Sequence, residues 1–371
     1  MRTKRILLLA CLVLVFVFVF VCLFPCCASA QEVSGIYEKS GAGELYDALD
    51  GETQDLLPQA GAEDGLWEGD SGEALLDTFS KLLREKLAAP VKGLAALLGV
   101  VILCRLAGCF EEGGDFSLLA GTLACAGILT APLLELIQAS EEVVESACVF
   151  LGVSVPVYSA LLVASGNTVV GGSYSFLTLL AGSVIPVISS ALLMPLLHVF
   201  LMLSLATSLC GAKFNRLLSS LYGFTKWLLV LAVTLFTGIL SVQTVINAQA
   251  DAATGKTVKL IASSAIPIVG GAFGDAVAAI QSSVQIVKSG VGAFGILAAI
   301  CVFAPTMIQA SLWMGVCLLG QVAADLFNTP RLGSLFGACA SVTRMILAIL
   351  VSVCAVAVVC AALVLFVKGS L

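Results

Sequence analysis

The stretch WLLVLAVTLFTGILSV, residues 227–242, contains no charged residue and is apolar along most of its length. A helix needs about 20 predominantly apolar residues to cross the hydrocarbon core of a bilayer. Runs of this kind recur from about residue 91 to the C-terminus. The sequence therefore predicts an all-α, polytopic helical membrane protein.

The composition agrees with this class of protein. Of the 371 residues, 60% are hydrophobic and only 11% are charged, whereas soluble domains carry about a quarter charged residues. The polar surface is too small to cover a soluble particle of this length.

The net charge of −6 is concentrated in one segment. Residues 31–88 contain four basic and 14 acidic residues, which gives 4 − 14 = −10, and the rest of the chain beyond residue 88 is nearly neutral. No basic patch fits a nucleic acid backbone. A nucleic acid partner is therefore not expected.

The N-terminus has the pattern of a secretory signal peptide. MRTKR supplies the positive region, residues 6–24 the apolar core, and ASA at 28–30 the cleavage signal. The long apolar core leaves an uncleaved anchor as the alternative. Either way, residues 31–88 are expected to form an acidic extracytoplasmic arm.

The end of this arm predicts an amphipathic helix over residues 73–88, because its large apolar residues recur at helical spacing. We expect the helix to lie on the membrane surface and to lead into the first span. Packing against the bundle is the alternative.

The membrane domain, residues 89–371, has about eight candidate spans. They are 91–110, 116–138, 147–165, 174–193, 195–211, 223–246, 291–322 and 337–367. With the arm outside, five crossings place the basic loop that carries Lys213, Arg216 and Lys226 in the cytoplasm, as the distribution of cations in membrane proteins favours.

Charged residues near the ends of spans are expected to reach the membrane surface. Arg105 and Glu135 lie near predicted span ends, and Arg344 lies near the start of the last span. The long side chain of Arg105 or Arg344 can extend to the interface, so none of the three is taken as a functional site.

The segment ATGKTVK, residues 253–259, resembles the end of a nucleotide-binding loop through Gly255, Lys256 and Thr257. Such a loop needs a glycine five residues before Gly255, where this chain has Ala250. We therefore interpret the three residues as a polar hinge, with Thr257 capping the following helix. No nucleotide or other cofactor is expected.

The centre of the chain predicts a break between two short half-helices, 258–269 and 275–289. Pro267 removes a backbone donor, Gly270 and Gly271 permit a tight turn, and Asp275 suits the start of a helix. A re-entrant pair fits this pattern, since irregular backbone at membrane depth must be buried in protein or line a cavity. A kinked interfacial helix is the alternative.

Other classes of function have weaker support. The V-G-G step near residue 170 echoes the one at 269–271, which favours a transporter with a site at the Pro267–Asp275 break. AFGD at 272–275 resembles part of an intramembrane aspartyl protease site, with Asp325 as the second carboxylate, and Ser173 with His198 resembles a rhomboid pair. Both lack the rest of their signatures, so no catalytic residue is assigned.

No metal site is expected either. The only histidine is His198, and the 14 cysteines show no zinc-type spacing. Most of the cysteines beyond the leader lie in apolar runs, where cysteine behaves as a small hydrophobic residue.

Two segments resemble the stage III sporulation protein AE family of endospore-forming bacteria. They are KFNRLLSSLYGFTKWLLVLAVTLFTGILSVQ at 213–243 and DAATGKTVKLIASSAIPIVGGAFGDAV at 251–277. The resemblance also covers the leader, the acidic arm and the layout of spans.

The resemblance implies a non-enzymatic subunit of the channel-like stage III A machinery in the mother-cell membrane around the forespore. It implies other membrane proteins of the same operon as partners, a forespore-membrane partner reached through the complex, and a separate secretion-type ATPase. Family members have no established catalytic residues to carry over.

Overall fold

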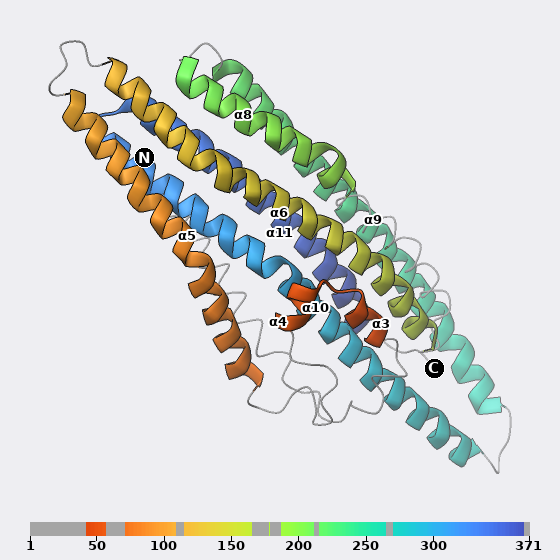
Figure 1. Ribbon diagram of the computed structural model, residues 1–371. Coiled ribbons are helices and arrows are strands. Elements are labelled where there is room, and N and C mark those ends of the chain that lie inside the picture. Colours follow the sequence, from red (N-terminus) through yellow and green to blue (C-terminus); the bar gives the residue numbers. More distant parts are fainter. Residues whose placement is uncertain are drawn as a thin grey trace.

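The protein is described by a computed structural model over residues 42–56, 71–108, 115–164, 178, 187–210, 215–264 and 270–366. Every regular element in these ranges is a helix, which confirms the all-α prediction. Figure 1 shows the long helices lying side by side along one axis. The predicted signal peptide lies outside the described residues.

The elements follow one another without any strand in the described ranges. In chain order they are α3 (Ala42–Asp47), α4 (Gly51–Leu56), α5 (Ser71–Gly108), α6 (Asp115–Ala164), the π-helix η2 (Ser189–Leu193), α8 (Met194–Cys210), α9 (Asn215–Ser264), α10 (Gly270–Leu326) and α11 (Pro330–Phe366). Six helices of the described part are long and apolar enough to cross a membrane. The protein is therefore a multi-pass membrane protein.

Helix α6 differs from the sequence prediction, which placed two spans at 116–138 and 147–165. The structure has one continuous helix of 50 residues. The polar stretch between the predicted spans does not interrupt it, because Glu142 and Glu145 lie on its exposed face while Val144 and Ala147 are buried. At 1.5 Å per residue the helix is about 75 Å long, well beyond the ~30 Å of the hydrocarbon core.

The centre of the bundle is the antiparallel pair α10 and α11, joined by the three residues Phe327–Thr329. Asn328 takes the left-handed conformation, with φ 53°, which asparagine tolerates better than most residues. The Thr329 hydroxyl donates to the Ala324 carbonyl at 3.0 Å. Pro330 then opens α11, at the one helical position that proline favours.

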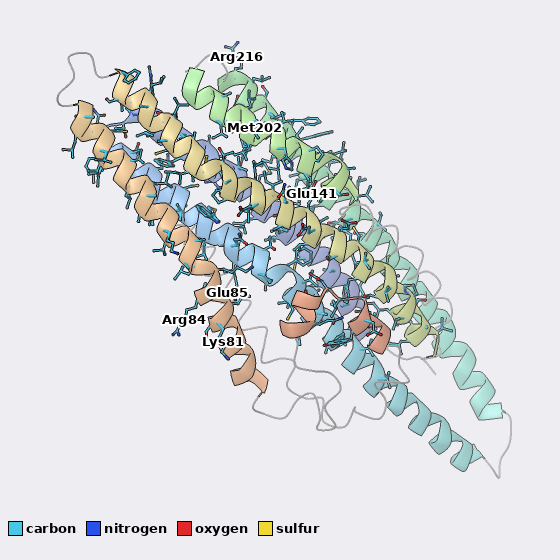
Figure 2. The ribbon with its side chains drawn as sticks, viewed as in Figure 1. Lys81, Arg84, Glu85, Glu141, Met202 and Arg216 are labelled. Carbon is cyan, nitrogen blue, oxygen red and sulfur yellow. The ribbon has the colours of Figure 1, made fainter. Side chains whose placement is uncertain are left out.

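Helix α5 joins two predicted elements. The amphipathic helix expected at 73–88 and the first span run together as one helix of 38 residues, with Pro90 inside it. Leu82 is buried, whereas Leu83 and Leu87 are exposed. Figure 2 shows Lys81, Arg84 and Glu85 near the lower end of this helix, and all three side chains are exposed.

The described part of the acidic arm packs on the bundle. Leu45 and Leu49 of this segment are buried in the common core. The Gln54 amide donates to the carbonyls of Tyr46 and Leu49, both at 3.0 Å. The short helices α3 and α4 are thus tied to each other and to the long helices.

Candidate functional site

The predicted break coincides with the end of α9 at Ser264 and the start of α10 at Gly270. Pro267 lies between them, outside the described residues. The two short half-helices are not separate elements, because they form the ends of helices of 50 and 57 residues. Glycine and serine weaken a helix without stopping it, whereas an internal proline removes a hydrogen bond.

The remaining residues of the break and of the hinge lie within helices. Gly271 and Asp275 belong to the first turns of α10, and Gly255, Lys256 and Thr257 belong to the interior of α9. The prediction of a hinge with a capping Thr257 is corrected accordingly. The helical backbone here uses its N–H groups internally, so it has no loop of free N–H groups of the kind that wraps phosphates.

The predicted basic loop is also largely helical. Arg216 and Lys226 lie in the first four turns of α9, and both side chains are exposed. Figure 2 shows Arg216 at the upper end of the bundle. Lys213 lies outside the described residues. The three cations were predicted to share a loop, and the structure instead places the two described ones along one helix.

A buried tyrosine marks the junction of α6, α10 and α11. Tyr158 is 1% exposed, and its hydroxyl has no hydrogen-bond partner in the described part of the chain. The nearby Ser154 donates its own hydroxyl to the Phe150 carbonyl. The Tyr158 hydroxyl fills the space that Gly295 leaves open, since a methyl group there would overlap it and would lie 3.3 Å from Ala361.

The same close packing recurs along α10 and α11. A Cβ atom on Gly292 would lie 2.7 Å from the Leu365 side chain, and one on Gly320 would lie 3.1 Å from the Phe336 ring. Small residues allow helices to approach closely in membranes. The junction is therefore a tightly fitted packing site, with no arrangement of nucleophile and base among the side chains described.

Arg344 lies in the interior of α11, fourteen residues after Pro330, rather than near the start of a span. Its side chain is partly buried and its Nε atom is buried without a hydrogen-bond partner among the described residues. Glu135 likewise lies inside the continuous α6, exposed, whereas Arg105 does lie near the end of α5. Sequence reasoning missed the position of Arg344 because it set the start of that span too late.

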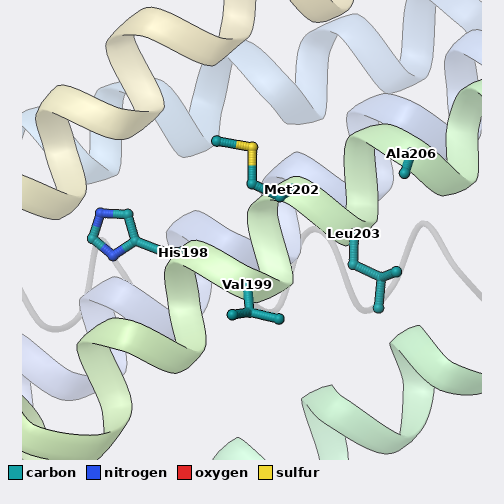
Figure 3. A pocket seen from close by; sticks show the side chains of 5 residues that line it. All are labelled: His198, Val199, Met202, Leu203 and Ala206. Carbon is teal, nitrogen blue, oxygen red and sulfur yellow. The ribbon is translucent and has the colours of Figure 1, made fainter.

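A shallow apolar groove follows α8. Figure 3 shows the side chains that line it: His198, Val199, Met202, Leu203 and Ala206. The His198 ring nitrogen Nδ1 lies 3.1 Å from the Met194 carbonyl oxygen, one turn earlier in the same helix. The histidine is thus bonded to its own backbone, and the groove offers a ligand mainly apolar surface.

The π-helix before α8 holds another polar group that sequence reasoning missed. The Met194 N–H donates to the Ser189 carbonyl, five residues back, and Pro195 follows with no N–H to donate. The Ser189 hydroxyl is buried without a partner in the described ranges. The described residues contain no group of three or more His, Cys, Asp or Glu side chains that could hold a metal ion.

Comparison with known proteins adds a finding that covers most of the chain. Residues 67–368 match the family model described as stage III sporulation protein AE. Over 312 residues the chain is 26% identical to stage III sporulation protein AE of Bacillus subtilis (strain 168), covering 81% of this chain and 77% of that protein. No solved structure matches.

Proposed function

Because this chain belongs to the stage III sporulation protein AE family, we propose that it is a non-enzymatic membrane subunit of the stage III A channel complex. The observation that supports the proposal is the extent of the match, which takes in every long helix from α5 to α11. The matched unit is thus the helical membrane bundle itself. In this role the protein needs no cofactor.

The proposed setting is the mother-cell membrane around the forespore, with the acidic arm outside the cytoplasm. If α5, α6 and α8 each cross once, and the chain crosses an even number of times elsewhere before α9, the connection from α8 to α9 lies in the cytoplasm, next to Arg216. The cation distribution of membrane proteins favours that side. The proposed partners are other membrane proteins of the operon, a separate secretion-type ATPase and a forespore-membrane protein.

The experiment is deletion of the gene in the organism that carries it, followed by complementation. We expect the deletion strain to grow normally and to stop spore development after engulfment, and the wild-type gene to restore spore yield. Normal spore yield in the deletion strain would contradict the proposal.

A second strain tests the region of the predicted break. Replacing Gly270 and Gly271 together with valine is expected to reduce spore yield, since both adjoin the predicted break at the start of α10, where glycine permits a tight turn that valine disfavours. Equal amounts of protein in the membrane, measured by immunoblot, are the control. Wild-type spore yield at equal protein level would count against a role for this segment.

A further inference from the structure

Helix α9 presents three different faces over residues 216–241. Its buried face packs on the bundle and consists of Thr225, Leu228, Leu229, Ala232 and Phe236. Within the described residues, α9 packs mainly on α8, α11 and η2. Figure 1 shows it at the edge of the bundle, beside α8. The other two faces of the helix are therefore left uncovered by the elements that the structure describes.

One uncovered face is apolar. Its side chains are all exposed and recur at helical spacing: Leu217, Phe224, Trp227, Leu231 and Leu235. The rings of Phe224 and Trp227 stack with their centroids 6.0 Å apart. This face suits contact with lipid. Acyl chains are as apolar as these side chains, so the side chains gain no hydrophobic free energy by packing against protein instead.

The other uncovered face is polar. It follows a spacing of three and four residues, which keeps all its members on one side of a helix. The members are Arg216, Ser219, Gly223, Lys226, Val230, Thr234, Thr237 and Ser241, and all of them are exposed. Only Val230 is a large apolar residue, and the sequence continues the same spacing with Thr244.

The hydroxyl groups of this polar face are satisfied within the helix. Thr234, Thr237 and Ser241 each donate to a carbonyl four residues earlier, at 2.7, 2.8 and 2.8 Å. Their hydroxyl oxygens can still accept hydrogen bonds from water. Lys226 forms no ion pair with a described residue, and a cation at such a site needs hydration or a counter-charge.

We propose that the polar face of α9 lines a water-filled pathway for hydrated solutes, and that the opposite wall is the same face of a further copy of this chain. A helix with separate faces for bundle, lipid and water is what such a wall requires. Identical faces suit one another across a layer of water around a symmetry axis, because water donates to the hydroxyl oxygens that stay free to accept. The same water hydrates Arg216 and Lys226, so the cations of the two copies need not touch. The proposal rests on the proposed channel function and gives this chain the part of a pore wall.

The test compares positions on the two uncovered faces of the same helix. Single cysteines replace Thr234, Thr237 and Ser241 on the polar face, and Leu231 and Leu235 on the apolar face, in the full chain within its native membrane. A charged, membrane-impermeant thiol reagent is added, and the unsubstituted chain gives the baseline for the native cysteines. All five positions are exposed in the single chain, so exposure alone cannot explain a difference.

We expect at least tenfold faster modification of the three polar-face cysteines than of the two apolar-face cysteines. Equal rates on both faces, or no modification of the polar face, would overturn the water-filled pathway. A short bis-maleimide is then expected to link Thr237→Cys chains into dimers but not Leu235→Cys chains. Modification without such dimers would overturn the assignment of the opposite wall to a second copy.

This experiment separates the inference from the function on which it rests. The labelling pattern is read in membranes and needs no spore formation, whereas the deletion strain is scored by spore yield alone. If the cysteines on both faces are modified at equal rates and the deletion strain fails to form spores, only the pore-wall assignment is rejected. If the polar-face cysteines are modified faster and the deletion strain gives a normal spore yield, only the sporulation role is rejected.

Discussion

At the scale of single residues, the packing of Tyr158 against Gly295 is the most specific contact of the core. We predict that Gly295→Ala lowers the stability of the detergent-purified protein by about 1–3 kcal/mol, the usual cost of overpacking, because the added methyl group overlaps the tyrosine hydroxyl. Thermal unfolding followed by fluorescence measures the change. Adding Tyr158→Phe should recover part of the loss, since it removes the overlapping oxygen.

The control for this pair is Gly315→Ala on the same helix. Nothing lies within 4 Å of a Cβ atom at that position, and alanine is the better helix former. The variant is therefore expected to unfold at the wild-type temperature or slightly above it. A comparable loss at both positions would show that the α10 backbone, rather than the tyrosine, resists the methyl group.

Arg344 gives a second prediction at this scale. A buried polar group without a partner costs about 1–3 kcal/mol, and the Nε atom of Arg344 is such a group in the described part of the chain. Arg344→Met should therefore leave thermal stability unchanged or raise it. A marked loss of stability in the same assay would mean that the guanidinium interacts with a partner. Variants that reverse the charge of Arg344 and of a candidate acidic residue together would then identify that partner.

Neither contact follows from the sequence alone. Tyr158 and Gly295 are 137 positions apart, and only the approach of α6 to α10 brings them together. The sequence does show that both stand in apolar runs, which predicts burial without naming the neighbour. Arg344 was recognised as a charged residue in a span, and its interior position became clear only with the start of α11 at Pro330.

At the scale of elements, the connection between α10 and α11 depends on the conformation of Asn328. Its φ of 53° disfavours a β-branched residue, and the left-handed region costs such residues about 1–2 kcal/mol. We predict that Asn328→Val lowers the unfolding temperature, whereas Asn328→Gly does not. If valine and glycine behaved alike, the turn would have to be free to adopt another conformation.

This turn illustrates what the sequence could have revealed. Asn-Thr-Pro at 328–330 is a common way to end one helix and begin another, and it stands between the two longest apolar runs of the chain. By contrast, the continuity of α6 was not predictable from average hydropathy. It depends on the face to which each glutamate belongs, and the helical period of Glu142 and Glu145 would have been the better guide.

At the scale of the whole molecule, the continuous α6 and the two predicted spans give opposite topologies. If α6 crosses once, the segments before and after it, at residues 112 and 168, lie on opposite sides of the membrane. Two spans would return the chain to the same side. We predict that reporter fusions after residues 112 and 168 report opposite sides, measured with a phosphatase that is active only outside the cytoplasm and a fluorescent protein that is active only inside.

The fold class was predictable because it depends on composition and on the length of apolar runs. A chain that is 60% hydrophobic, with runs long enough to span a bilayer, has few alternatives to a helical bundle. The arrangement of the helices was not predictable, because apolar runs of similar length are interchangeable until side-chain shape decides which helices meet. The uncovered polar face of α9 lies between these cases, since its spacing is visible in the sequence but its exposure is not.

The three-residue link from α10 to α11 also simplifies assembly of the bundle. With so little slack between them, α10 and α11 stay neighbours once both are in the bilayer. The pairing that helps to bury Phe303 and Trp313 therefore needs no search across the membrane, and the loop-closure entropy of forming it is small.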